Sequence, residues 1–292
     1  MEDSKSKRKR IKEIEVMVAD VIKETPDTST IFLFTGNDRL DYKAGHFLTI
    51  NPRQFKSLYR FTLYLEDMKG KKETPRAYSM SSAPHEPHLA FTVKEERYIS
   101  GQTPYPPLLS PMLVHRMKIG MRIMITGFTG PYTMPDDLAD RTDNILHICA
   151  GSGVVPNFSI IKESLHNNDP FKHTLIFSNK LVEDIMFHRQ FEELRAHYPD
   201  KFEVIYCATR EEGDVNIRGG FKGRISPELI KKYAPDSSNV HCFVCGPGIT
   251  KWDKIAAKKK GEEPTPRFLE ASLSFLEELG IKKNQITRES YG

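Results

Sequence analysis

Two segments of the chain combine residue types that bind phosphorylated ligands, and the first is rich in glycine. Gly151-Ser152-Gly153-Val154-Val155-Pro156 lies between a predicted strand and a predicted helix. Glycines let backbone N–H groups approach a pyrophosphate, and the N-terminus of the following helix stabilises its charge. Pro156 occupies the place of the third glycine in the dinucleotide-binding fingerprint, so a tight turn without a ligand explains this segment equally well.

The second segment, Arg76–Ser82 (RAYSMSS), carries a guanidinium, a phenol and several hydroxyls. Arg76 could pair with a phosphate, because its forked donors suit that anion. Tyr78 could stack on a ring, and Ser79 could donate a hydrogen bond to a ring nitrogen or oxygen. Taken alone, the same residues also fit a polar edge strand.

Two further motifs lie toward the C-terminus. Cys245-Gly246-Pro247-Gly248 ends a predicted strand, and Glu289-Ser290-Tyr291 almost ends the chain. Ligands of parallel sheets lie beyond the carboxyl ends of the strands, which favours the first motif as part of a site. A terminal tyrosine is ordinarily a frayed surface residue.

The cysteines do not indicate a metal site. Cys242 and Cys245 form a C-x-x-C, but residues three apart in a strand point to opposite faces. No second C-x-x-C completes a zinc or iron–sulfur ligand set. We therefore expect no metal, and four cysteines in a chain of this size do not make a disulfide framework.

The elements that position these motifs differ between the two halves of the chain. In the first half, period-two alternation predicts antiparallel strands. These are Ile14–Val21, Thr30–Phe34, His46–Ile50, Tyr59–Leu65, Leu89–Val93 and Arg122–Ile125. Six such strands within about 130 residues favour a closed barrel, because closure leaves no edge strand.

In the second half, strands alternate with helices. The predicted strands are Asn144–Ala150, His173–Phe177, Phe202–Ala208, Val240–Cys245 and Gln285–Glu289. The predicted helices are Asn157–His166, Asp184–His197, Pro227–Tyr233 and Pro266–Leu279. This order predicts a doubly wound parallel sheet with helices on both faces. We expect a β-barrel domain at 11–138 and an α/β domain at 139–292.

Composition limits the function classes. The 292 residues carry a net charge of +4, and the basic segment 1–10, which we expect to be a disordered tail, supplies most of it. A nearly neutral body argues against a protein that coats nucleic acid. The uncharged stretch Asn144–Ile161 is broken by two glycines and a proline, so no transmembrane segment is expected. No apolar region of a signal peptide follows the tail, and the expected location is cytoplasmic.

Together, the order and spacing of the motifs resemble the ferredoxin–NADP⁺ reductase superfamily over roughly Ile11–Gly292. The resemblance implies an FAD-binding barrel and an NAD(P)-binding α/β domain. Implied FAD ligands are Arg76, Tyr78, Ser79, Ser82, Leu109 and Ser110. Implied nicotinamide-nucleotide ligands are Gly151, Gly153, Pro156, Gly246 and Pro247. Gly130-Pro131-Tyr132 resembles the turn that ends the barrel in this family.

The resemblance also implies roles for the residues nearest the reaction. Ser79 would lie near flavin N5, and Cys245 would lie beside the nicotinamide C4, with Glu289 in the same pocket. Tyr291 would stack on the isoalloxazine. Lys180, Arg210 and Arg224 would meet the 2′-phosphate of NADPH, although they fit solvated surface cations as well, so NADPH and NADH both remain open.

The implied activity is hydride transfer from a reduced nicotinamide to FAD, followed by transfer of single electrons to a separate ferredoxin, flavodoxin or oxygenase component. We expect no fused ferredoxin domain, and the long insertion Lys251–Pro266 is basic. With the tail, this insertion could steer an acidic partner, or it could only confer solubility. Two alternatives are a free-standing diaphorase that acts on small acceptors and a flavin- or nucleotide-binding subunit without turnover.

Overall fold

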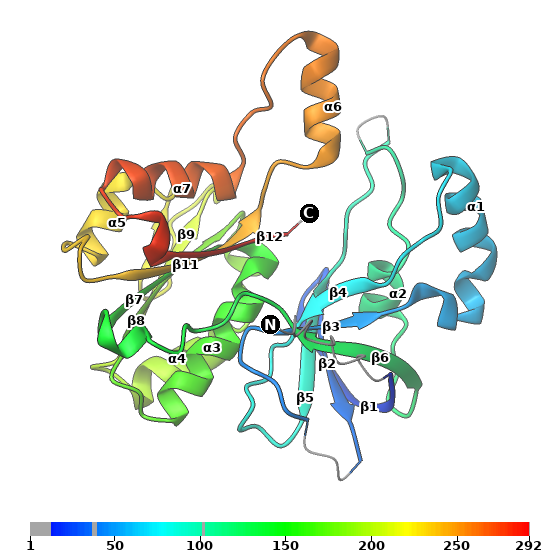
Figure 1. Cartoon of the computed structure of the whole chain (residues 1–292), viewed down its shortest axis with the longest axis horizontal. Coiled ribbons are helices and arrows are strands. Elements are labelled where there is room, and N and C mark those ends of the chain that lie inside the picture. Colours follow the sequence, from blue (N-terminus) through cyan, green and yellow to red (C-terminus); the bar gives the residue numbers. More distant parts are fainter. Residues whose placement is uncertain (1–12, 37–39, 101–102, 292) are drawn as a thin grey trace, which may run out of the picture.

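The computed structural model describes residues 13–36, 40–100 and 103–291. The basic segment 1–10, predicted as a tail, lies outside these ranges. The described residues form two domains, each built on a six-stranded sheet (Figure 1).

The first domain is antiparallel, with the strand order β4-β3-β6-β1-β2-β5. Its strands are β1 (Ile14–Thr25), β2 (Thr28–Phe34), β3 (Phe47–Ile50), β4 (Arg76–Ser79), β5 (Leu89–Lys94) and β6 (Arg122–Thr129). The end strands β4 and β5 approach one another at a bridge between Met80 and Phe91. Beside it, the N–H groups of Ser81 and Ser82 both donate to the carbonyl of Ala90, at 2.8 and 3.2 Å. The sheet therefore curls around one interior.

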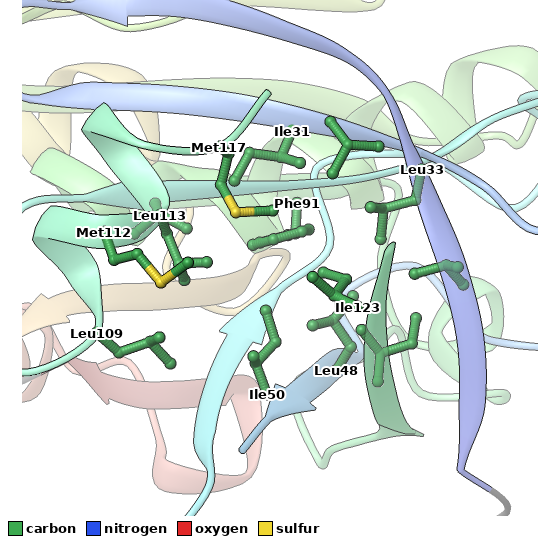
Figure 2. Packing of buried hydrophobic residues seen from close by; sticks show 14 of the residues in the cluster. Ile31, Leu33, Leu48, Ile50, Phe91, Leu109, Met112, Leu113, Met117 and Ile123 are labelled. Carbon is green, nitrogen blue, oxygen red and sulfur yellow. The ribbon is translucent and has the colours of Figure 1, made fainter. Parts of the chain in front are cut away.

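Alternating side chains of these strands fill that interior. Ile31, Leu33, Leu48 and Ile50 are each at most 1% exposed, and they face one another across the domain (Figure 2). Helix α2 (Ser110–His115) packs over one side of this core through residues such as Leu113. The predicted antiparallel β domain is confirmed.

One predicted strand of this domain is wrong. Tyr59–Leu65 belongs to helix α1 (Tyr59–Lys69), which two short 3-10 turns precede, η1 (Pro52–Gln54) and η2 (Lys56–Leu58). Apolar residues alternate along the segment. The buried residues of the helix, however, are Thr62 and Leu65, which lie three positions apart, as on one side of a helix. Gly70 ends the helix with a left-handed φ of 62°, as helix caps commonly do. The sixth strand is β4, which belongs to the segment Arg76–Ser82 whose side chains suit a phosphate and a ring.

The second domain has an all-parallel sheet with the order β10-β9-β8-β7-β11-β12. Its strands are β7 (Asn144–Ala150), β8 (Lys172–Asn179), β9 (Phe202–Ala208), β10 (Gly220–Lys222), β11 (His241–Pro247) and β12 (Ile286–Tyr291). Its α-helices are α3 (Val154–His166), α4 (His188–His197), α5 (Pro227–Tyr233), α6 (Lys251–Lys260) and α7 (Phe268–Glu278). Short 3-10 turns are η3 (Leu138–Asp140), η4 (Gly151–Gly153), η5 (Val182–Asp184) and η6 (Lys283–Gln285).

Helices cover both faces of this sheet, as predicted. Helices α3 and α4 pack on the face that carries Leu175 and Phe177, whereas α5 and α7 pack on the face of Ile176 and Val244. The doubly wound architecture is therefore confirmed. Strand β10 and helix α6 were not predicted, and α6 projects away from the sheet (Figure 1). None of the helices within the described ranges has the length and hydropathy of a membrane crossing.

Candidate functional site

The strand order of the second sheet reverses between β7 and β11, which places a crevice beyond their carboxyl ends. The predicted glycine segment forms η4 at the end of β7 and leads into α3. A Cβ on Gly153 would lie 2.2 Å from the carbonyl oxygen of Cys245, so only glycine allows this turn to rest on the end of β11. Gly151 has a φ of +52° and open space where a Cβ would be. A ligand can therefore approach the backbone at Gly151.

The two C-terminal motifs lie side by side in this crevice. Strands β11 and β12 pair in parallel register, so that Cys245 is opposite Glu289 and Pro247 is opposite Tyr291. Cys245 is fully buried, and burial raises the pKa of its thiol well above the ordinary value. The thiol is therefore neutral near pH 7 and packs as a small apolar group.

Glu289 carries a carboxyl group in an unfavourable place. Burial raises its pKa to about 7, and its buried Oε2 has no hydrogen-bond partner among the described residues. An unpaired polar atom of this kind is costly in a folded protein, and perturbed acids concentrate at functional sites. Glu289 can thus exchange a proton near neutral pH.

Tyr291 joins the C-terminal strand to the β domain. Its hydroxyl donates a hydrogen bond to the Ser79 hydroxyl at the end of β4. In Figure 1, β12 runs from the α/β domain toward β4. The ring also packs against a buried cluster that contains Tyr132, Phe243 and Cys245. The four residues predicted to be catalytic, Ser79, Cys245, Glu289 and Tyr291, are therefore linked to one another.

Arg76 lies on the same strand as Ser79 but is already engaged. Its guanidinium forms an ion pair with the buried carboxylate of Glu73 and donates to the carbonyl of Thr74 at 2.6 Å. Lys69 donates to the other oxygen of Glu73 at 2.6 Å. Burial alone would raise the pKa of Glu73, but the hydrogen bonds from Lys69 and Arg76 outweigh it and lower that pKa. Two cations thus share one carboxylate, and one positive charge is left over for an anion.

The other implied flavin ligands fall in different surroundings. Tyr78 is half-buried and lies against Phe91, with ring centroids 5.8 Å apart. Leu109 is part of the hydrophobic core of the β domain. Ser110 begins α2, and its hydroxyl accepts the N–H of Glu96 at 3.0 Å.

The hydroxyl of Ser82 is engaged within the β domain. Its hydroxyl accepts the N–H of Ala90 at 2.9 Å and is 2.9 Å from the hydroxyl of Tyr42. These contacts place it on the side of the β domain that faces helix α3, where the carbonyl of Ser82 accepts from Ser159 at 2.7 Å.

The three cations implied for a 2′-phosphate lie on neighbouring loops. The N–H of Arg210 donates to the carbonyl of Lys180 at 2.8 Å, and the N–H of Gly223, next to Arg224, donates to the carbonyl of Ala208 at 3.0 Å. All three side chains are exposed, and within the described ranges none of them forms an ion pair. The structure therefore brings them to one edge of the sheet.

A buried polar network was missed by the sequence analysis. The Tyr132 hydroxyl and His147 Nδ1 both donate to Asn157 Oδ1, at 3.1 and 2.8 Å. Asn157 Nδ2 donates to the carbonyl of Gly153 at 2.8 Å. His147 Nε2 then accepts from His173 Nδ1 at 3.0 Å. Burial lowers the pKa of His147 to about 4. A neutral network thus ties the turn that ends the barrel to the glycine turn.

The sequence held a signal for each of these features. Asn157 is a polar residue directly after Pro156, and Glu73 is an acid three residues before Arg76. The basic insertion forms α6, and Trp252 in it meets Tyr105 of the β domain edge-on, with centroids 5.6 Å apart. Among the residues that the structure describes, no group of His, Cys, Asp and Glu side chains is arranged to hold a metal ion.

Comparisons with known proteins agree with this arrangement. Residues 147–251 match the model of the oxidoreductase NAD-binding domain. NADH-cytochrome b5 reductase 2 of Emericella nidulans is 31% identical over 225 residues, which cover 74% of this chain and 62% of that protein. NADH-cytochrome b5 reductase 2 of Mycosarcoma maydis is 31% identical over 218 residues, 72% of this chain and 57% of that protein. The chain thus spans about three-fifths of the length of these relatives.

Solved structures share the fold at lower identity. The flavohem-like FAD/NAD-binding domain of nitric oxide dioxygenase from Vibrio cholerae has a TM-score of 0.70 at 18% identity, covering 96% of this chain and 98% of that one. The cytochrome b5 reductase domain of Ulva prolifera nitrate reductase has a TM-score of 0.70 at 19% identity, covering 95% and 97%. Together with the strand orders of the two sheets and the sequence relatives, these matches show that the chain has the two-domain fold of the ferredoxin–NADP⁺ reductase superfamily.

Proposed function

We propose that the chain is an FAD-dependent NAD(P)H reductase that passes electrons to a separate acceptor. The observation that carries this proposal is the bond between Tyr291 and Ser79, because it joins the crevice of the α/β domain to the end of β4. Proposed domain limits are 11–138 for FAD and 139–292 for NAD(P).

The residues present fit the two cofactors. The surplus positive charge around Glu73 suits the flavin pyrophosphate, with Arg76 as the ligand. Ser79 and the unpaired Oε2 of Glu289 offer polar atoms where the flavin ring and nicotinamide would meet. The open backbone at Gly151 suits the nucleotide pyrophosphate. Gly153, Pro156, Gly246 and Pro247 shape that crevice, and Tyr78, Ser82, Leu109 and Ser110 remain proposed FAD contacts.

When bound, FAD would accept a hydride from the reduced nicotinamide and release electrons singly. The chain's own residues would position these groups and exclude water. Cys245, small and neutral, leaves room for the nicotinamide beside it. Tyr291 covers the place where that ring must bind, and Glu289 can hold or release a proton at its carboxyl group near neutral pH.

Fewer observations support the proposed acceptor and the proposed coenzyme. The name of the sequence relatives pairs NADH with cytochrome b5, so we add cytochrome b5 to ferredoxin, flavodoxin and an oxygenase component as proposed acceptors. The exposed cations Lys180, Arg210 and Arg224 favour NADPH over NADH if they bind its 2′-phosphate. Helix α6, with Lys258, Lys259 and Lys260 in its last turn, is a proposed docking element for an acidic partner.

Anaerobic mixing of the purified protein with NADH and with NADPH tests the proposal. The yellow flavin band should bleach with at least one coenzyme, and cytochrome b5 or ferredoxin should then be reduced. Arg76→Ala should purify with much less FAD, whereas the control Arg53→Ala, which breaks a similar ion pair with Glu66, should retain it. Bound flavin that neither coenzyme bleaches would instead support a binding subunit without turnover.

A further inference from the structure

A cavity of about 360 Å³ lies between the two domains, away from Tyr291 and Cys245. Its walls come from β1, β2, β5 and the segment after β4 on one side, and from α3, α4 and Phe187 on the other. Ligand sites of this size are typically found at domain interfaces. The cavity therefore has the size and position of a small-molecule site.

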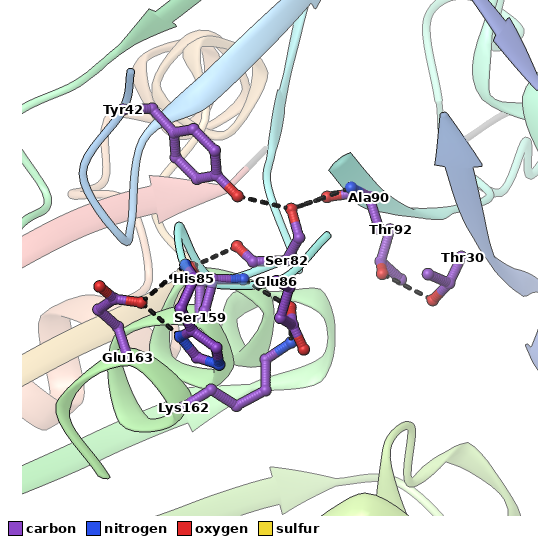
Figure 3. Close-up of polar contacts among 11 residues, drawn as sticks. Thr30, Tyr42, Ser82, His85, Glu86, Ala90, Thr92, Ser159, Lys162 and Glu163 are labelled. Carbon is purple, nitrogen blue, oxygen red and sulfur yellow. Dashed lines mark hydrogen bonds and ion pairs between the residues drawn. The ribbon is translucent and has the colours of Figure 1, made fainter. Parts of the chain in front are cut away.

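Specific contacts between the domains border this cavity (Figure 3). Lys162 of α3 forms an ion pair with Glu86 at 2.5 Å, and the Ser159 hydroxyl donates to the carbonyl of Ser82 at 2.7 Å. His85 Nδ1 and Glu163 Oε2 are 2.6 Å apart. Because these contacts already satisfy one another, their charges do not require a ligand.

Two other lining groups are less well satisfied. Ser81 is 2% exposed, and its hydroxyl has no hydrogen-bond partner among the described residues. Glu24 accepts from the Thr30 hydroxyl at 2.7 Å and from the N–H of Phe187 at 3.4 Å, but it forms no ion pair in the part of the chain that the structure describes. A half-buried carboxylate without a contacting cation favours a positively charged occupant.

The charges of the residues that line the cavity also favour a positively charged occupant. Glu24, Glu86 and Glu193 line the cavity, and Lys162, the lining lysine, is held by Glu86. Arg189, outside the lining, pairs with Glu193 at 3.5 Å and acts on Glu24 only through its field. An anion would meet this excess of carboxylates, whereas a cation would reduce it.

The remaining lining is aromatic and apolar. Phe158 and Phe187 stack with ring centroids 4.4 Å apart, and Phe32 and Leu194 add further apolar surface. Aromatic walls bind flat rings by stacking and attract cations to their faces.

We propose that this interdomain cavity binds a small aromatic amine, with its ammonium group at Glu24 and its ring against Phe158 and Phe187. Residues from both domains form the site, so an occupant joins them. Of the proposed FAD contacts, Ser82 also lines this cavity, whereas Arg76, Tyr78 and Ser79 do not. The inference does not depend on the proposed reductase activity.

Isothermal titration calorimetry with three indoles of one ring and different charge tests this proposal. Tryptamine is a cation, tryptophol is neutral and indole-3-propionate is an anion. The flavin-containing protein should bind tryptamine about tenfold more tightly than tryptophol, as expected for a charge-assisted hydrogen bond. It should bind indole-3-propionate more weakly than either.

Two variants locate the binding. Glu24→Gln should weaken tryptamine binding about tenfold and leave tryptophol binding unchanged. The control Glu183→Gln removes an exposed carboxylate outside the lining and should change neither. Gln190→Trp should fill the cavity and abolish binding of both ligands, and it does not alter the carboxylates. Absent tryptamine binding, equal affinities for the three indoles, or full tryptamine affinity in Gln190→Trp would each overturn the proposal.

These measurements require no turnover. A protein that binds tryptamine at this cavity but is not reduced by NADH or NADPH would refute the reductase proposal and leave the cavity site intact. A protein that is reduced by NADH or NADPH but does not bind tryptamine would refute the cavity site and leave the reductase proposal intact.

Discussion

Glu289 should make the folded protein lose stability as pH rises toward and past neutrality. Burial raises the pKa of its carboxyl to about 7 from an ordinary value of 4.5. Between these two values the folded state holds more protons than the unfolded state, so the free energy of unfolding decreases as pH rises. Below about pH 4.5 the group is protonated in both states and contributes no such penalty.

The magnitude follows from the shift. Each pKa unit corresponds to about 1.4 kcal/mol, so the penalty above pH 7 has an upper bound of about 3 kcal/mol. Cys245 and Tyr291, which face the carboxyl, have pKa values raised by burial and remain neutral over this range. They therefore neither pair with Glu289 nor add their own titration.

Glu289→Gln removes the titration while keeping the shape of the side chain. Urea unfolding of both proteins, from about pH 4.5 to about pH 8.5, should show the variant gaining up to about 3 kcal/mol relative to the parent as pH rises. The control Glu277→Gln removes an exposed carboxylate of α7 and should show a constant difference. If the difference for Glu289→Gln is also constant, the carboxyl is not buried without a partner and the reasoning fails.

Three further changes address the rest of the site. Tyr291→Ser should bind NAD(P)⁺ more tightly, turn over more slowly and brighten flavin fluorescence, because the ring would no longer cover the proposed nicotinamide site. Unchanged affinity and emission would contradict this. Replacing Arg210 and Arg224 by Ala should raise the KM for NADPH about tenfold or more with a small effect on NADH, and equal effects in steady-state kinetics would place them elsewhere. Tyr132→Phe should cost about 1 kcal/mol in urea unfolding by removing a donor to Asn157, so an unchanged midpoint would argue against that bond.

The parallel sheet could be predicted because its strands are buried on both faces and read as apolar runs between helices. The predicted ranges for β7 and β9 agree with the structure residue by residue. Strand β10 has three residues, two of its neighbours being glycines, so no pattern could indicate it. The strand predicted at Tyr59–Leu65 was wrong for another reason. Four apolar residues alternate there on a helix that buries only one side, and alternation alone cannot distinguish such a helix from a strand.

The sequence identifies the candidate site residues of each motif, but it does not identify the residues that contact them. Ser79 and Tyr291 are 212 residues apart, and only the two-domain arrangement brings their hydroxyls together. The network of Asn157 depends in the same way on Tyr132 and His147, which come from different elements. Local sequence specifies a strand end or a turn, whereas burial without a partner, as at Glu289, appears only when the whole fold is assembled.

The contacts of Tyr291 set the energy of opening the proposed site. Its hydroxyl bond to Ser79 contributes about 0.5–1.5 kcal/mol net, and packing of the ring adds a similar amount. In the proposed site, a nicotinamide that replaced the ring would restore the packing and would cost only the single hydroxyl bond, so ordinary binding energy would be enough to displace the ring. Because the backbone of Tyr291 in β12 is paired with Pro247 in the neighbouring strand β11, the ring can leave while β12 stays in the sheet. Opening therefore needs movement of a side chain at the end of the chain rather than separation of the domains, whose contacts at Lys162 and Ser159 can stay in place.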